Sequence, residues 1–540
     1  MVEGANPTME LMPEAPPRLR ELIVSGMRWT FWLSLVAAPL GYGTSVLLAR
    51  TGPEVIGTYG LLMVYIGVVS SLFYFGGDAV VIKFVPELEP EQRLAFLGSY
   101  FLVITAALIP WLAAASFRPR ELHYLFGRPA GQRFELIVLY LSPIYIAFSL
   151  IVAALKSVLE IRWAQVLLRL VTAGSFVLYA LLFFARPILL RGHYTGLIWG
   201  IYLGLTAMAS VLGLVKLMCL PDWPNRRRSL RFFLPRGFWI YALSLEQGSA
   251  LGFLSQRLDL ILILNFGGLT VLGKYVAIIT LAEIIRVANR FFLDSLLPSL
   301  TNLLAAHSLA AASQLVSMNL RILFAVNIAA TCGLAFLVRP ITALLGPQYG
   351  GMNSLFVLMI VCFGLSAPGA VGGTLLTSVG KQQHTVWVAM GQLVLYVLLF
   401  LTLWPRWQLS GAVAAYGVST LVASVGFLLV AKRVVPIEFS AAGNYALFAL
   451  ITLGTGWGAT FLRTIEITLG MVASAASLAL FLLLAGYSIG ECQRLAECFF
   501  PVQPGLTGAL GLQPVLQRLN SWRQKAVAPF DRNGRGGAAE

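Results

Sequence analysis

The chain is divided into long apolar runs, each close to the length that an α-helix needs to cross a lipid bilayer. A crossing takes about 20 residues, and because lipid offers no hydrogen bonds to the backbone, such runs fold as helices. About 14 runs meet this length, at residues 29–49, 58–80, 94–116, 134–155, 163–184, 196–219, 238–264, 274–296, 315–338, 352–377, 385–404, 410–431, 441–462 and 466–489. The sequence therefore predicts an all-α integral membrane protein with about 14 transmembrane helices.

The composition excludes a soluble protein and argues against a nucleic-acid partner. Of the residues, 58% are hydrophobic and 11% are charged, so most of the surface must face lipid. The net charge of +15 would suit a phosphate backbone. The basic residues are, however, spread over short loops, where Lys and Arg orient membrane spans. We expect the lipid bilayer as a partner, and no nucleic acid.

The same basic residues predict how the chain is oriented. An even number of spans leaves both termini on one side, and that side carries about twice as many basic loop residues as the other. Arg226–Arg228 lie on the richer side, whereas the main opposing cluster is Arg118, Arg120, Arg128 and Arg133. We therefore expect both termini to be cytoplasmic. The five cysteines show no C-x-x-C spacing and only four histidines occur, so neither a metal nor a cofactor is indicated.

A short pattern occurs twice, 216 positions apart. Gly52–Tyr59 and Gly268–Tyr275 share Gly, Val, Gly and Tyr in register, and Val177–Phe183 resembles Val394–Phe400 at nearly the same offset. We interpret this as a duplication that gives two parallel six-helix lobes, related by a pseudo-twofold axis along the membrane normal. The predicted parts are a cytoplasmic leader (1–28), an N-terminal lobe (29–219), a basic cytoplasmic linker (220–237), a C-terminal lobe (238–431), two additional C-terminal helices (441–489) and a cytoplasmic tail (490–540). Two alternatives stay open for the tail, an interfacial helix and simple disorder.

Charged residues inside the spans are the candidates for function, because charges in hydrocarbon are costly and seldom face lipid. Span 274–296 carries four on one helical face, at steps of three, four and four: Glu283, Arg286, Arg290 and Asp294. Span 238–264 adds Glu246, Arg257 and Asp259.

We expect a central cavity in which arginines hold the phosphates of an amphiphile, since guanidinium matches phosphate oxygens in bidentate fashion. The candidate substrate-binding residues are Arg286, Arg290, Glu283 and Arg257. The alternative is that Glu283–Arg286 and Arg290–Asp294 are ion pairs that only allow the span to insert. The two readings are not exclusive.

A second set of carboxylates is a candidate for gating or ion coupling. When the two repeats are aligned at the offset of 216, Asp78 corresponds to Asp294, and each lies at the cytoplasmic end of its span. Together with Asp259 and Glu246, they could open a gate or carry a proton or a sodium ion. For Asp78 and Asp294 the alternative is solvation at a loop end.

No catalytic residue is indicated. The sequence contains no G-x-x-x-x-G-K-[ST] phosphate loop, which argues against an ATP-driven pump. The loops are short, whereas membrane-embedded glycan enzymes usually need a large loop for their acid and base residues. We therefore expect no enzyme activity.

The sequence resembles the polysaccharide transporter family of lipid-linked oligosaccharide flippases, which is related to multidrug exporters and lipid II flippases. The resemblance covers about residues 25–435 and lies in Leu47–Tyr59, Lys83–Glu87, Leu258–Leu262, Gly273–Tyr275, Leu345–Tyr349, Ser378–Lys381 and Ser410–Ala414. It implies a two-lobed bundle of 12–14 helices whose cavity opens alternately to either side. It also implies cationic cavity residues that bind a pyrophosphate.

The function implied is a flippase in the bacterial cytoplasmic (inner) membrane that moves a polyprenyl-pyrophosphate-linked oligosaccharide for exopolysaccharide, capsule or O-antigen assembly. Its partners would be this glycan lipid, a polysaccharide polymerase and the export machinery. Two alternatives stay open: a multidrug or small-molecule antiporter of the same architecture, and a membrane-embedded glycan enzyme.

Overall fold

The computed structural model describes residues 39–117, 132–158, 160–185, 195–220, 232–305, 309–379, 381–434, 446–454 and 474–478, with single positions at 33, 37, 458 and 472. No strand occurs among these residues. Besides helical stretches at 39–51 and 446–454, the elements are α2 (Pro53–Phe73), α3 (Gly77–Glu87), α4 (Pro90–Phe117), α6 (Gln132–Ser157), α7 (Ile161–Ala185), α8 (Thr195–Met218), α9 (Phe238–Ala305), α10 (Leu309–Phe336), α11 (Val338–Leu345), the 3-10 helix η5 (Pro347–Met352), α12 (Asn353–Ser378) and α13 (Gln382–Val434).

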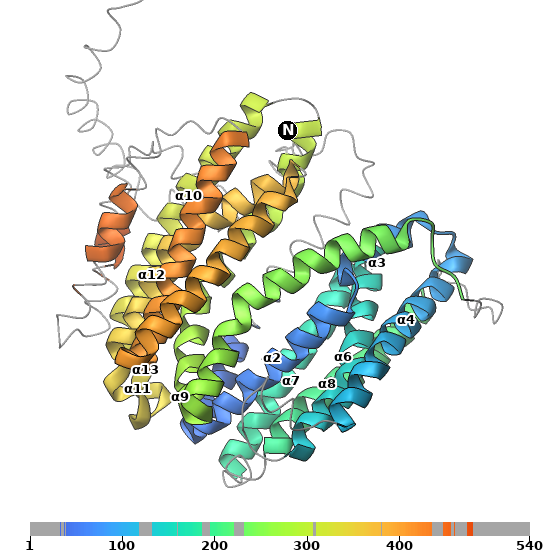
Figure 1. Ribbon diagram of the computed structural model, residues 1–540, viewed down its shortest axis with the longest axis horizontal. Helices are drawn as coiled ribbons and strands as arrows, with labels where there is room; N and C mark the ends of the chain where they lie inside the picture. The colour runs from blue at the N-terminus through green and yellow to red at the C-terminus, as the bar shows by residue number, and fades with distance from the viewer. Residues whose placement is uncertain are drawn as a thin grey trace, which may run out of the picture.

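The helices form a multi-pass membrane protein, as the sequence predicts. In the described part of the chain, seven helices are long and apolar enough to cross a bilayer. Figure 1 shows α2, α3, α4 and α6–α8 gathered on one side, which we call the first bundle, and α10, α12 and α13 on the other, which with α9 we call the second bundle. The α9 helix runs between the two groups and packs against α2, α12 and α13.

Two of these helices are each long enough for two crossings and contain one break. The α9 helix has 68 residues and leaves helical geometry at Gly268, where φ is 75°. The α13 helix has 53 residues and breaks at Gln408, where φ is 44°. The breaks fall between predicted spans, 238–264 and 274–296 in the first case and 385–404 and 410–431 in the second. A positive φ lets the backbone change direction sharply at one residue, so these pairs need almost no loop.

The predicted span 58–80 is wrong in its boundaries. The helix α2 starts five residues earlier and ends at Phe73, and the chain then bends at Phe75, Gly76 and Gly77, which have φ values of 42°, 81° and 52°. A Cβ at Gly77 would lie 2.3 Å from the Tyr74 ring, so only glycine fits there. The helix resumes as α3, and Asp78 consequently lies in the first turn of a new helix.

The start of α9 packs on the first bundle. Phe238 is 1% exposed, and its ring lies 6.4 Å from Phe84, 6.1 Å from Phe96 and 5.3 Å from Tyr100, measured between centroids. The Phe96 and Tyr100 rings meet Phe238 at angles typical of edge-to-face aromatic contacts, whereas the Phe84 ring is tilted at 43° to it. The first residue of α9 is therefore part of the core of the preceding bundle.

Several predicted parts lie outside the described residues. These are the leader 1–28, most of the linker 220–237, the tail 490–540 and most of the two additional helices within 441–489. The side chains of Arg290 and Asp294 also lie outside, although the backbone of both belongs to α9.

Candidate functional site

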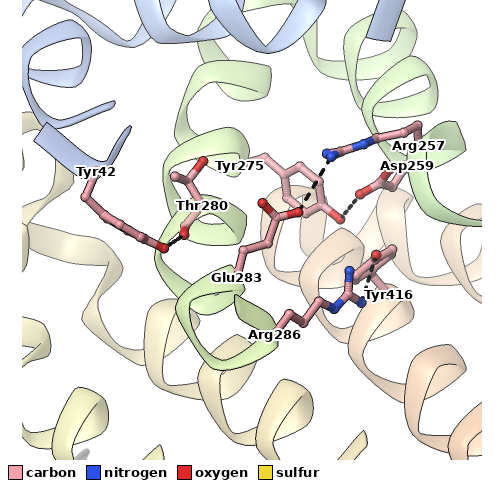
Figure 2. Close-up of polar contacts among 8 residues, drawn as sticks. All are labelled: Tyr42, Arg257, Asp259, Tyr275, Thr280, Glu283, Arg286 and Tyr416. Atoms are coloured by element: carbon pink, nitrogen blue, oxygen red, sulfur yellow. Dashed lines mark hydrogen bonds and ion pairs between the residues drawn. The ribbon is translucent and has the colours of Figure 1, made fainter. Parts of the chain in front are cut away.

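The break at Gly268 brings the two halves of α9 together and pairs their polar residues. The Tyr275 hydroxyl donates a hydrogen bond of 2.8 Å to Oδ2 of Asp259 (Figure 2). Both side chains are buried, with Asp259 1% exposed. The second carboxylate oxygen of Asp259, Oδ1, is buried and has no hydrogen-bond partner among the described residues. A buried carboxylate with one free oxygen is costly unless a further group reaches it.

A second pair links the same two half-helices. Nη2 of Arg257 lies 3.7 Å from Oε1 of Glu283, and the two side chains are 32% and 34% exposed. Figure 2 shows Arg257 reaching across from the first half of α9 to Glu283 on the second half. This pair is the accessible part of the cluster, because both partners retain about a third of their exposure.

Arg286 points away from that pair and into the second bundle. Its guanidinium carbon lies 4.0 Å from the centroid of the Phe363 ring of α12, and its Nη2 lies 3.4 Å from the Tyr416 hydroxyl of α13 (Figure 2). A guanidinium stacked on an aromatic face is held in one orientation. Arg286 is therefore fixed by three helices of one bundle.

The four residues 257, 259, 283 and 286 form a compact cluster with two positive and two negative charges, which we call the α9 charge cluster. Glu283 and Arg286 share a helical face as predicted, but Glu283 pairs with Arg257 and Arg286 contacts Tyr416. Tyr416 is 2% exposed, so the partner that Arg286 contacts is buried, whereas the Arg257–Glu283 pair is about a third exposed.

The helical stretch 39–51, which packs against α7 of the first bundle, contacts the second bundle close to this cluster. The Tyr42 hydroxyl, from the helical stretch 39–51, donates a short hydrogen bond to the carbonyl oxygen of Thr280 (Figure 2). Thr280 lies one helical turn before Glu283 on α9. The Arg257–Glu283 pair therefore lies near the boundary between the two bundles.

Two of the other predicted carboxylates, Asp78 and Glu246, lie together at the break between α2 and α3. The Tyr74 hydroxyl donates a bond of 2.8 Å to Oδ1 of Asp78, whose other oxygen lies 3.7 Å from Nζ of Lys156. The backbone N–H of Gly76 donates a bond of 2.9 Å to Oε2 of Glu246. Among the described residues, no hydrogen bond or ion pair joins this group to the α9 charge cluster. Asp294, predicted as the counterpart of Asp78, has its side chain outside the described residues.

The sequence interpretation missed the residues that hold the cluster in place. The aromatic partners Tyr275, Phe363 and Tyr416 look like ordinary apolar-span residues, and nothing in their spacing marks them. Asn289 and Asn327 carry a visible signal, because each is an amide inside an apolar span. They are 4% and 1% exposed and exchange two hydrogen bonds of 3.1 Å and 2.8 Å between α9 and α10.

Among the described residues, no group of three or more His, Cys, Asp or Glu could hold a metal ion. Guanidinium groups and tyrosine hydroxyls can bind anions, and carboxylates can exchange protons. An ion pair between a guanidinium and a carboxylate can separate when another charged group approaches. They make the cluster suited to electrostatic binding inside an apolar bundle.

The fold and the charge cluster together define a class, namely membrane bundles with ionisable residues enclosed between apolar helices. Comparison of the sequence with protein-family models and with curated proteins gives no match. Solved structures do match. The fold is similar to that of the lipid II flippase MurJ in an inward closed conformation, with a TM-score of 0.66, 10% identity, and coverage of 84% of this chain and 98% of that one.

Other similar structures are transporters of the MOP superfamily. An inward-facing multidrug resistance MATE family transporter has a TM-score of 0.62 and 12% identity over 74% of this chain and 94% of its own. A MOP superfamily transporter from Pyrococcus furiosus, described as having a binding pocket of reverse polarity, has a TM-score of 0.54 and 15% identity over 80% and 98%. The chain thus has the fold of MOP superfamily transporters.

Proposed function

We propose that the protein is a flippase that moves a polyprenyl-pyrophosphate-linked oligosaccharide across the bacterial cytoplasmic membrane by alternating access. The glycan lipid would serve exopolysaccharide, capsule or O-antigen assembly, beside a polymerase and export machinery. The fold supports a transporter, because the similar structures are a lipid flippase and multidrug transporters. Both termini would be cytoplasmic, as the basic loops predict.

The observation that carries the proposal is the Arg257–Glu283 pair, which is about a third exposed near the boundary of the two bundles. An intramembrane arginine that keeps this exposure must face water or a polar ligand rather than lipid. A pyrophosphate offers several anionic oxygens and can replace Glu283 as the partner of Arg257. Arg286, whose guanidinium contacts Phe363 and Tyr416, adds a positive charge that is fixed on the second-bundle side of the pair.

The remaining predicted residues complete the proposal. Arg290 lies on the same helical face as Glu283 and Arg286, one turn further along α9, and would contact the second phosphate. Asp259, Asp78, Glu246 and Asp294 are proposed to gate the pathway or to couple it to a proton or sodium gradient. The buried, half-satisfied carboxylate of Asp259 is the best placed of these, because it adjoins the arginines.

The test is transport by purified protein in liposomes. A fluorescent polyprenyl-pyrophosphate sugar should cross the bilayer, and the double variant Arg286→Ala with Arg290→Ala should abolish transport while the protein still inserts. Exposed Arg406 gives a matched control, since Arg406→Gln removes one positive charge far from the cluster in sequence. Unimpaired transport in the double variant would refute a role for Arg286 and Arg290, and unimpaired transport in Arg257→Gln would refute the phosphate site. An imposed pH or sodium gradient in the same assay identifies the coupling ion.

The same assay separates the two alternatives. A multidrug antiporter would move cationic dyes and ignore the pyrophosphate lipid, although exposed arginines disfavour cations at this site. Transfer of the sugar to another molecule would point to an enzyme.

A further inference from the structure

A pair of asparagines joins α9 to α10 inside the second bundle. The Asn289 amide donates a hydrogen bond of 3.1 Å to Oδ1 of Asn327, which donates one of 2.8 Å back to Oδ1 of Asn289. The Asn327 amide also donates a bond of 2.7 Å to the carbonyl oxygen of Leu323 in its own helix. The two side chains are 4% and 1% exposed. Both amides are therefore bonded through oxygen and nitrogen, which requires one particular placement of the two helices.

The asparagines lie close to the contacts that hold Arg286. Asn289 follows Arg286 by three residues on α9, so both lie on the same side of that helix. On α10, Thr331 lies one turn after Asn327. A Cβ on Gly364 of α12 would overlap Oγ1 of Thr331, so α10 and α12 are in close contact at this point.

The three helices are joined in a closed set of contacts, which we call the α9–α10–α12 triangle. The asparagines join α9 to α10, and Gly364 joins α12 to α10. Phe363, the neighbour of Gly364, completes the set, because its ring centroid lies 4.0 Å from the guanidinium carbon of Arg286 on α9. Each helix thus contacts both others, and α9 cannot rotate about its axis without breaking one of the contacts.

A polar pair fixes this rotation more strictly than apolar packing does. Lipid is as apolar as the helices, so apolar surfaces within a bilayer have little driving force toward one arrangement. When α9 rotates away from α10, in contrast, buried donors and acceptors lose their partners. A buried asparagine fixes the register of coiled coils for the same reason.

We propose that Asn289 and Asn327 are positioning residues, which hold the charge of Arg286 beside the Arg257–Glu283 pair and thereby raise the affinity for a lipid pyrophosphate. Both side chains are buried, so they act through α9 and do not contact the substrate. The inference rests on the proposed function, because it assigns the two residues a part in the phosphate site.

The first experiment removes the polar pair without leaving either amide unpaired. Asn289→Leu with Asn327→Leu, which we call the pair variant, replaces both partners by apolar side chains, a change that costs little stability. Its unfolding midpoint in detergent should equal that of the parent. Its affinity for a fluorescent lipid pyrophosphate in nanodiscs should fall about fivefold, which corresponds to about 1 kcal/mol. Asn265→Leu, at an exposed position of α9, should leave both quantities unchanged.

A second measurement separates positioning from a merely structural role. Arg286→Gln should weaken binding about tenfold in the parent but only about twofold further in the pair variant, since changes that act through one contact are not additive. A tenfold loss in both backgrounds would overturn the positioning role. Unchanged affinity in the pair variant would overturn it as well.

Gly364→Ala tests the triangle from another side and leaves both asparagines intact. The new Cβ would push α12 away from Thr331 and move the Phe363 ring off the guanidinium, so binding should again weaken about fivefold. The matched control is Gly373→Ala in the same helix, where a Cβ meets nothing nearer than 3.9 Å. Parent-like binding by Gly364→Ala would contradict the triangle, even if the pair variant fails to fold.

A last experiment keeps this inference distinct from the proposed function. A parent protein that does not bind the lipid pyrophosphate would refute the phosphate site, and unfolding midpoints would then still test the triangle. Arg286→Gln and Phe363→Leu should shift the midpoint non-additively in the parent, because the two side chains are in contact, and additively in the pair variant. The same non-additivity in both backgrounds would show that the asparagines do not orient Arg286.

Discussion

In the proposed phosphate site, Glu283 competes with the phosphate for Arg257, so removing the charge of Glu283 should strengthen substrate binding. Two unit charges about 4 Å apart attract by about 4 kcal/mol at an effective dielectric constant of 20. Arg257 Nη2 and Glu283 Oε1 are 3.7 Å apart, but both side chains are about a third exposed. Exposed pairs retain only about 1 kcal/mol after solvent screening and ordering of the side chains.

Glu283→Gln should therefore tighten binding of a polyprenyl pyrophosphate about fivefold, since a tenfold change is about 1.4 kcal/mol. Arg257→Gln should weaken it. Binding is measured by equilibrium titration of a fluorescent lipid pyrophosphate in nanodiscs at fixed salt. Glu89→Gln, which changes an exposed carboxylate between α3 and α4, should leave it unchanged. Weaker binding by Glu283→Gln would refute the competition between carboxylate and phosphate.

Three further outcomes concern the surroundings of the cluster. Tyr275→Phe removes the hydroxyl that donates to Asp259 and should cost about 1–3 kcal/mol of stability, measured by thermal unfolding in detergent; an unchanged midpoint would contradict it. Asn327→Ala leaves the Asn289 amide without its two hydrogen bonds and should cost about 1–2 kcal/mol of stability, the range for polar contacts between membrane helices. The same assay measures it, and the unfolding midpoint of the exposed control Thr402→Ala should not change. Raising ionic strength should weaken lipid pyrophosphate binding, whereas salt-independent binding would place the phosphate away from Arg257.

Much of the fold could be predicted because the length of an apolar run is a local property. The predicted spans 94–116, 134–155, 163–184 and 196–219 lie within a few residues of α4, α6, α7 and α8. The span 58–80 failed because apolar residues continue across a break in the backbone. Two adjacent glycines, Gly76 and Gly77, were the signal, but glycine is common in membrane helices and seldom breaks them.

Only those relations in the candidate site that lie within a single helix could be predicted from the sequence. Helical spacing placed Glu283 and Arg286 on one face, because that relation depends on the helix alone. Their partners come from elsewhere: Arg257 lies across the break at Gly268, and Tyr416 lies 130 residues away on α13. Sequence spacing does not reveal which helices meet, so the direction in which Arg286 points could come only from the structure.

Phe238 has a consequence for how the chain assembles during synthesis. The aromatic core of the first bundle includes Phe238, which follows the end of α8 by 20 positions. Phe84, Phe96 and Tyr100 can therefore contact Phe238 only after the start of α9 has been synthesised. A truncated chain that stops after α8 would leave these rings without their partner. An autonomous N-terminal fragment should therefore extend into the first turns of α9, beyond the boundary that the repeat suggests.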